Sequence, residues 1–124
     1  MDFFIGTPSQ YSKSKMVSKD APTSIPKGSY FVTMKDGPEL AGSLIAKRYE
    51  NSVIIRHVEI REDYRGIGFG KKIMDVIIEH LKPKKLPIQL YVDPQNTPAV
   101  NLYKKLGFKL IKKGAAFGDK YALS

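Results

Sequence analysis

The chain of 124 residues contains no cysteine and only two histidines. The lack of cysteine excludes disulfides, thiolate metal sites and cysteine nucleophiles, and two histidines leave little for a histidine-based metal site, so we expect no metal. No apolar run approaches the roughly 18 residues of a membrane span. Residues 1–6 lack both the basic region and the long apolar stretch of a secretory signal. We therefore expect a cytoplasmic protein without membrane contact.

Positive charge is what the chain has in excess. Lysine and arginine number twenty-one against twelve acidic residues, a net charge of +9. Residues 61–124 alone carry thirteen basic and six acidic side chains, which gives +7. Such an excess predicts an anionic partner, which is nucleic acid, a phosphorylated cofactor or an acidic protein surface. A solvated surface without a partner accounts for the charge equally well.

The chain divides into two regions at about residue 28. Residues 1–28 contain three prolines, five serines and four lysines without periodicity, which predicts an irregular N-terminal segment with a short strand near residues 3–5. Residues 29–124 have the length of one domain. In this second region, three β-rich runs separated by turn residues predict an antiparallel meander at residues 29–35, 40–49 and 52–60.

Two helices and three more strands follow the meander. Apolar residues recur at steps of three and four from Gly70 to Leu81, which predicts an amphipathic helix that Pro83 ends. A second helix begins at Pro98, where Asn96 or Thr97 can cap it. Strands are expected at residues 87–92, 108–112 and 120–123. The order βββ-α-β-α-ββ predicts a mixed α/β fold and excludes a doubly wound sheet.

A glycine-rich segment, Arg65-Gly66-Ile67-Gly68-Phe69-Gly70-Lys71, lies between a predicted strand and the first helix. Glycines permit a sharp turn that leaves N–H groups at the helix N-terminus, where phosphate oxygens bind. The dinucleotide fingerprint fails because position 71 is lysine, and the Walker loop fails because position 65 is arginine and position 72 is lysine. Taken alone, the segment could also be a turn without a ligand.

Two blocks together resemble the GNAT superfamily of acyl-CoA-dependent N-acetyltransferases, over about residues 29–124. The first is the R-x-x-G-x-G pattern that begins at Arg65, preceded by residues 58–64. The second is N-x-x-A-x-x-L-Y-x-x-x-G-F, from Asn96 to Phe108. The resemblance implies a compact fold with a mostly antiparallel central sheet, splayed at a V-shaped acetyl-CoA site. It also implies that the family's N-terminal helical pair is shortened or absent, because residues 6–28 are too short and too broken by proline.

The resemblance also assigns residues to the cofactor. Backbone groups of the splayed strand would pair with the pantetheine arm, and the N–H groups after Arg65 would take the pyrophosphate. Two asparagines on the second block would reach the pantetheine. The cofactor-binding residues implied are Val58, Ile60, Arg65, Gly66, Ile67, Gly68, Phe69, Gly70, Lys71, Asn96 and Asn101.

Catalysis requires a neutral amine, a stabilised oxyanion and a proton for the departing thiolate. Tyr103 occupies the family position that donates to the thiolate, although a tyrosine on an apolar helix face also suits core packing. We favour Glu59 as the base. His57 shares its strand face if the strand keeps its period of two. Tyr91 and Asp93 are alternatives that would order a water molecule.

The short N-terminal segment implies an open and shallow acceptor side. This favours a lysine or an N-terminal amine of a protein as the acceptor. A small-molecule amine remains an alternative, particularly if a homodimer partner supplies the missing wall. A third alternative is a non-catalytic module that binds nucleic acid or an acidic protein through its lysines. Nucleic acid is not favoured, because no aromatic residues interleave with those lysines in the sequence.

Overall fold

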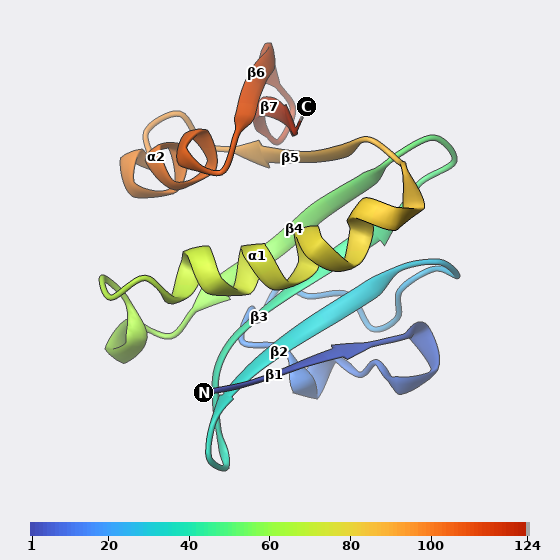
Figure 1. The fold of residues 1–124 in the computed structure, drawn as a ribbon, viewed down its shortest axis with the longest axis vertical. Helices are drawn as coiled ribbons and strands as arrows, with labels where there is room; N and C mark the ends of the chain where they lie inside the picture. The colour runs from blue at the N-terminus through green and yellow to red at the C-terminus, as the bar shows by residue number, and fades with distance from the viewer. Residues whose placement is uncertain (124) are drawn as a thin grey trace.

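Within residues 1–123, which the computed structural model describes, seven strands and two α-helices form a mixed α/β fold (Figure 1). Short 3₁₀ turns lie at Pro8–Gln10, Lys13–Lys15, Glu62–Tyr64 and Lys82–Lys84. The helices are α1 (Phe69–Leu81) and α2 (Thr97–Lys105). The strands are β1 (Asp2–Gly6), β2 (Tyr30–Asp36), β3 (Glu39–Arg48), β4 (Val53–Ile60), β5 (Ile88–Val92), β6 (Phe108–Ala115) and β7 (Gly118–Leu123).

All strands join one sheet in the order β1-β2-β3-β4-β5-β7-β6. Only β4 and β5 run parallel, and every other neighbouring pair is antiparallel, as predicted. The predicted strands and helices are all present. Strand β6 extends to Ala115, three residues further than predicted, because its hairpin with β7 continues to the pair Ala115 and Gly118.

Both helices cover one face of the sheet, and the main core lies between them and the strands. The predicted apolar stripe of α1 is buried, with Ile73, Met74 and Ile77 fully inaccessible. Burying one such side chain contributes about 1.5–3 kcal/mol. The α-helix ends before Pro83, which cannot donate a backbone hydrogen bond. Neither helix of residues 1–123 combines the length and the hydrophobicity that crossing a membrane requires.

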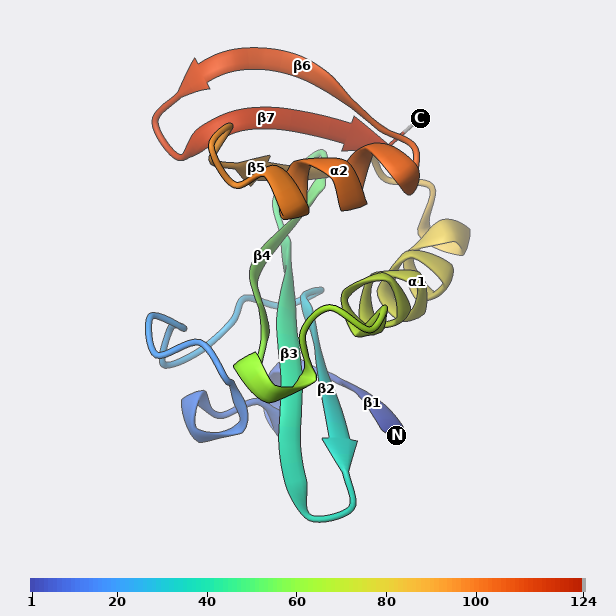
Figure 2. The same cartoon turned by 90° about the vertical axis from the view of Figure 1, so that its left-hand side faces the viewer.

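Residues 7–28 cover the opposite face of the sheet (Figure 2). They contain two 3₁₀ turns and no α-helix, so the prediction that the helical pair is shortened or absent is confirmed. Met16, Ala21 and Ile25 form a small second core with Phe31 and Ile45. The irregular segment is therefore held to the sheet by apolar packing on the face that α1 leaves uncovered.

Candidate functional site

The two parallel strands pair over only part of their length. Val53 lies opposite Ile88 and Ile55 lies opposite Leu90, but the pairing stops there. Strand β4 then stays with β3, while β5 stays with β7 as far as Val92. Backbone groups of a central strand point alternately to its two neighbours, so those that β4 directs at the split lack a strand partner. In Figure 1 the two strands diverge, β5 running toward α2 while β4 passes behind α1.

A β-bulge lies on β4 at the start of this split. The pairing with β3 shifts between Ser43 and Ile45, which leaves His57 and Val58 opposite the single Leu44. His57 has φ of 55°, a left-handed conformation that is costly for a residue other than glycine. The period of two therefore breaks here. The break falls between Arg56 and His57, which both line the smaller cavity. His57 and Glu59 share a face, as expected, because Glu59 lies opposite Ser43, whose hydroxyl accepts a hydrogen bond from the Val17 N–H of the irregular segment.

The glycine-rich turn leads directly into α1. Gly66 and Gly68 have φ of 79° and 91°, and a Cβ added at either would meet no atom within 4 Å. The first turn of α1 has no acidic side chain, and the first N–H groups of a helix lack intrahelical partners. Arg65 Nε donates to the carbonyl of Ile60 at 2.7 Å, which fastens the turn to the end of β4. An anionic group can therefore approach these N–H groups closely.

An open cavity of about 760 Å³ connects the strand split with the glycine-rich turn. It is lined by every predicted cofactor-binding residue except Ile67, whose side chain is 65% exposed. Both predicted catalytic residues, Glu59 and Tyr103, line it as well. Sequence reasoning did not single out five further lining residues, although all fall within the two blocks that carry the resemblance: Tyr64, Pro98, Ala99, Leu102 and Lys105.

Helix α2 presents Tyr103 and the two asparagines to this cavity. Tyr103 is only 7% exposed and packs edge-to-face on Phe108, with ring centres 6.0 Å apart. Burial raises the pKa of Tyr103 to about 12, so its hydroxyl keeps its proton at neutral pH. Asn96 caps the helix, with its side-chain oxygen accepting from the Ala99 N–H at 3.4 Å. Asn101 lies exposed on the same helix.

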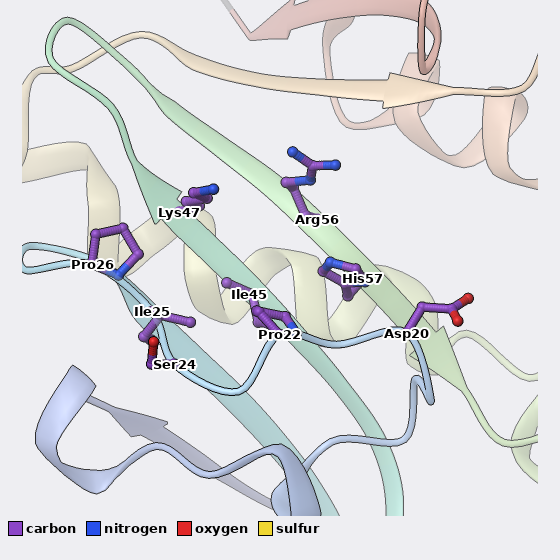
Figure 3. A pocket seen from close by; sticks show the side chains of 9 residues that line it. All are labelled: Asp20, Pro22, Ser24, Ile25, Pro26, Ile45, Lys47, Arg56 and His57. Carbon is purple, nitrogen blue, oxygen red and sulfur yellow. The ribbon is translucent and has the colours of Figure 1, made fainter.

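A second, smaller cavity of about 200 Å³ lies on the opposite face of the sheet (Figure 3). One wall comes from residues 20–26 of the irregular segment, and the other comes from β3 and β4 through Ile45, Lys47, Arg56 and His57. His57 lines this cavity and the adjacent Val58 lines the larger one, so the two cavities lie on either side of the bulge. No pattern in the irregular segment could have predicted this second cavity.

The surroundings of His57 keep its imidazole neutral. Burial lowers the pKa of His57 first, and the charges of Arg56 and Lys47 lower it further, while Asp20 opposes them. Above pH 6.5 the imidazole can therefore accept a proton. Among the described residues, no group of three histidine, aspartate or glutamate side chains could hold a metal ion.

Comparison with known proteins now identifies the family. Residues 3–108 match the model of the acetyltransferase (GNAT) family. The chain belongs to this family. A mycothiol acetyltransferase of Thermobifida fusca is 39% identical over 62 residues, which cover 49% of the chain and 19% of that protein. An N-alpha-acetyltransferase of Sulfurisphaera tokodaii is 35% identical over 57 residues, covering 44% of the chain and 34% of that protein. The chain thus spans a fifth to a third of these two relatives.

Solved structures show the same GNAT fold. Escherichia coli ElaA superimposes with a TM-score of 0.82 at 16% identity, and the match covers 100% of both chains. The PaiA N-acetyltransferase of Thermoplasma acidophilum, solved in complex with coenzyme A, has a TM-score of 0.71 at 20% identity. That match covers 79% of this chain and 62% of PaiA. The predicted GNAT-like fold is confirmed.

Proposed function

We propose that this GNAT-family chain is an N-acetyltransferase that moves the acetyl group of acetyl-CoA to a primary amine. The observation that carries the proposal is the single cavity that joins the splayed strands to an open helix N-terminus. A long ligand with a phosphate group at one end and an amide-containing arm at the other fits this combination. The family match and the names of the relatives support acetyl transfer.

Acetyl-CoA would be held largely by backbone groups. Groups of Val58 and Ile60 on the unpaired side of β4 would pair with the pantetheine arm, in the way that an added strand pairs with a sheet edge. The N–H groups of residues 67–71 would receive the pyrophosphate, and Arg65 and Lys71 would add positive charge. Asn96 and Asn101 on α2 would contact the pantetheine from the other side of the cavity.

Acetyl-CoA supplies a thioester whose carbonyl carbon accepts the amine. A carbon–nitrogen bond forms, the carbon–sulfur bond breaks, and the thiolate takes the proton of the Tyr103 hydroxyl. A backbone N–H on β4, near residues 58–60, would stabilise the negative charge that develops on the carbonyl oxygen. The raised pKa keeps the Tyr103 hydroxyl protonated at neutral pH, so its proton is present when the thiolate leaves.

The amine must also lose a proton. We propose Glu59 as the base, because it lines the same cavity as Val58 and Tyr103. His57 is the second candidate. It lines the smaller cavity beside the bulge, and its lowered pKa keeps it neutral. The smaller cavity would admit the acceptor amine from the face opposite α1.

We propose that the acceptor amine belongs to a protein, as a lysine or an N-terminal amine. The acceptor side is bounded by an irregular segment with mostly exposed residues, which leaves room for a macromolecule. A relative named N-alpha-acetyltransferase agrees with this class. A small-molecule amine is the second candidate, and the relatives named mycothiol acetyltransferase favour it.

Calorimetric titration with acetyl-CoA tests the cofactor site. We expect micromolar binding by the wild type and at least about tenfold weaker binding by Lys71→Glu, because a carboxylate would face the pyrophosphate. Lys113→Glu changes the charge equally on β6, outside the cavity, and should bind normally. Well-folded protein that binds no acetyl-CoA would contradict the proposal. The basic surface would then favour the non-catalytic alternative.

Mass spectrometry with mixed acceptors tests the acceptor class. Peptides with free N-termini, peptides with internal lysines and small polyamines would be offered together with acetyl-CoA. Acetylation of peptides supports the proposed acceptor, whereas exclusive turnover of a small amine would replace it with the second candidate.

A further inference from the structure

Two positively charged side chains lie on the sheet face opposite α1. Lys47 pairs with Ile54, and Arg56 pairs with Ile45, so both side chains point to the face that residues 7–28 partly cover. Both line the smaller cavity (Figure 3). The four ion pairs within residues 1–123 lie elsewhere, and none includes Lys47 or Arg56. Their positive charge is therefore not neutralised by a neighbouring carboxylate.

Tyr49 and His57 respond to the potential that these cations create. Arg56 Nη1 donates to the Tyr49 hydroxyl at 3.3 Å, and Lys47 Nζ lies 5.2 Å from the centre of its ring. Burial acts to raise the pKa of Tyr49, but the Arg56 hydrogen bond and the two charges lower it below its ordinary value. Asp20, the acidic residue that lines the cavity, does not offset them at His57. The cavity is therefore electropositive.

Further cations and aromatic rings extend this surface across β5 and β7. The Arg56 guanidinium lies 5.0 Å from the ring centre of Phe117, which is 65% exposed. Phe117 packs on Tyr91 at 5.8 Å, and Lys120 Nζ lies 5.5 Å from the Tyr91 ring. We call the surface formed by these cations and aromatic rings the Arg56 surface; its residues are Lys47, Tyr49, Arg56, Tyr91, Phe117 and Lys120. Since it runs beyond the cavity over β5, β7 and the turn between β6 and β7, it suits an extended partner better than a single metabolite.

Building on the proposed acetyl transfer, we propose that the acceptor is an acidic peptide that lies along the Arg56 surface. Its amine enters the smaller cavity at the His57–Val58 bulge, where the positive potential favours the neutral amine that the reaction needs. Aspartate or glutamate side chains next to the amine pair with Lys47, Arg56 and Lys120, because guanidinium and carboxylate form charge-assisted hydrogen bonds. A nucleic acid fits less well, because its phosphates would approach Asp20 and it offers no aliphatic amine.

The test uses short peptides that share one N-terminal residue and differ only in the next three positions, which are glutamate, glutamine or lysine. With the wild type, we expect kcat/KM to fall roughly five- to tenfold at each step from glutamate to glutamine to lysine. In Arg56→Gln and Lys47→Gln, kcat/KM for the glutamate peptide should be nearly equal to kcat/KM for the glutamine peptide. The KM of acetyl-CoA should not change. Lys104→Gln, the same charge change on α2, should keep the wild-type ratio.

Peptide binding in the presence of free CoA separates this inference from the proposed catalysis. Fluorescence anisotropy should show the same order of affinity and the same dependence on Arg56, even if no peptide is acetylated. Equal binding of the three peptides would overturn the inference, and so would acetylation rates that do not depend on peptide charge. Neither result would contradict the proposed acetyl transfer. Tighter, Arg56-dependent binding of a single-stranded oligonucleotide would overturn it too. A free acidic amino acid acetylated as efficiently as the peptides would remove the requirement for an extended partner.

Discussion

At the scale of the residue, Tyr103 connects packing with chemistry. Its ring packs on Phe108 in the core, and its side chain also lines the large cavity. Tyr103→Phe keeps the ring and removes only the hydroxyl. We expect kcat to fall about 10²-fold or more, which is the size of a lost general-acid contribution. The KM of acetyl-CoA should not change. Steady-state kinetics would contradict the assignment if Tyr103→Phe stayed within threefold of the wild-type kcat.

The same tyrosine predicts how stability changes in alkali. An unfolded tyrosine has a pKa of about 10, whereas that of folded Tyr103 is about 12. Between these pH values the folded state holds more protons, so the free energy of unfolding falls as pH rises. The loss from this group is complete above the folded pKa and amounts to at most about 2–3 kcal/mol. Urea titrations at pH 8 and 11 should show a smaller loss for Tyr103→Phe than for the wild type; equal losses would contradict the burial effect.

Glu59 and His57 can be distinguished by substituting each in turn. We expect Glu59→Gln to lower kcat/KM about 10²-fold, because it removes the proposed base. His57→Gln should have a much smaller effect, because the proposal does not use the imidazole as the base. The pH dependence of kcat/KM provides the control. A rate that rises with a midpoint below 6.5, and loses that midpoint only in His57→Gln, would assign the base to His57 instead.

At the scale of the element, the sequence predicts those features that are determined by residues close together in the chain. The limits of α1 follow from Gly68, the apolar period and Pro83, all of which act within a few residues. The strand split and the bulge at His57 depend on how β4 pairs with β3 and β5, which are distant in sequence. Only the resemblance to GNAT proteins indicated the split, and nothing indicated the bulge. The assumed period of two therefore fails between Arg56 and His57, which both line the smaller cavity.

The irregular segment provides an element-scale prediction. Ile25 is 7% exposed, belongs to the small core with Phe31 and Ile45, and lines the smaller cavity. Ile25→Ala should lower the free energy of unfolding by about 2–4 kcal/mol. It should also raise the KM of the acceptor and leave the affinity for acetyl-CoA unchanged.

Ile78→Ala is the matched control, since Ile78 is 6% exposed and lies in the main core under α1. It should destabilise the fold by a similar amount without changing the KM of the acceptor. Equal effects of Ile25→Ala and Ile78→Ala on that KM would show that residues 20–26 do not shape the acceptor side.

At the scale of the whole molecule, the two sequence blocks predicted the large cavity because each carries its own local geometry. The glycine turn precedes α1 and the asparagine cap precedes α2. The cavity therefore forms where the fold places the N-termini of these two helices near each other. The acceptor side lacks such local signals. The cations of the Arg56 surface are separated in sequence, and Phe117 approaches Arg56 only through the β6–β7 hairpin. Aromatic residues do interleave with cations here, although the linear sequence gave no sign of it.

The net charge of +9 finally permits a test of nucleic acid as the partner. Proteins that make six to ten phosphate contacts lose about 10³–10⁵ in affinity between 50 and 200 mM salt. The proposed cofactor site instead uses backbone N–H groups and two side chains, Arg65 and Lys71. We therefore expect the Kd of acetyl-CoA to rise less than about tenfold over this range, and oligonucleotide binding to be weak even at 50 mM salt. Tight oligonucleotide binding at 50 mM salt that weakens steeply by 200 mM would mean that the positive charge of the chain binds nucleic acid.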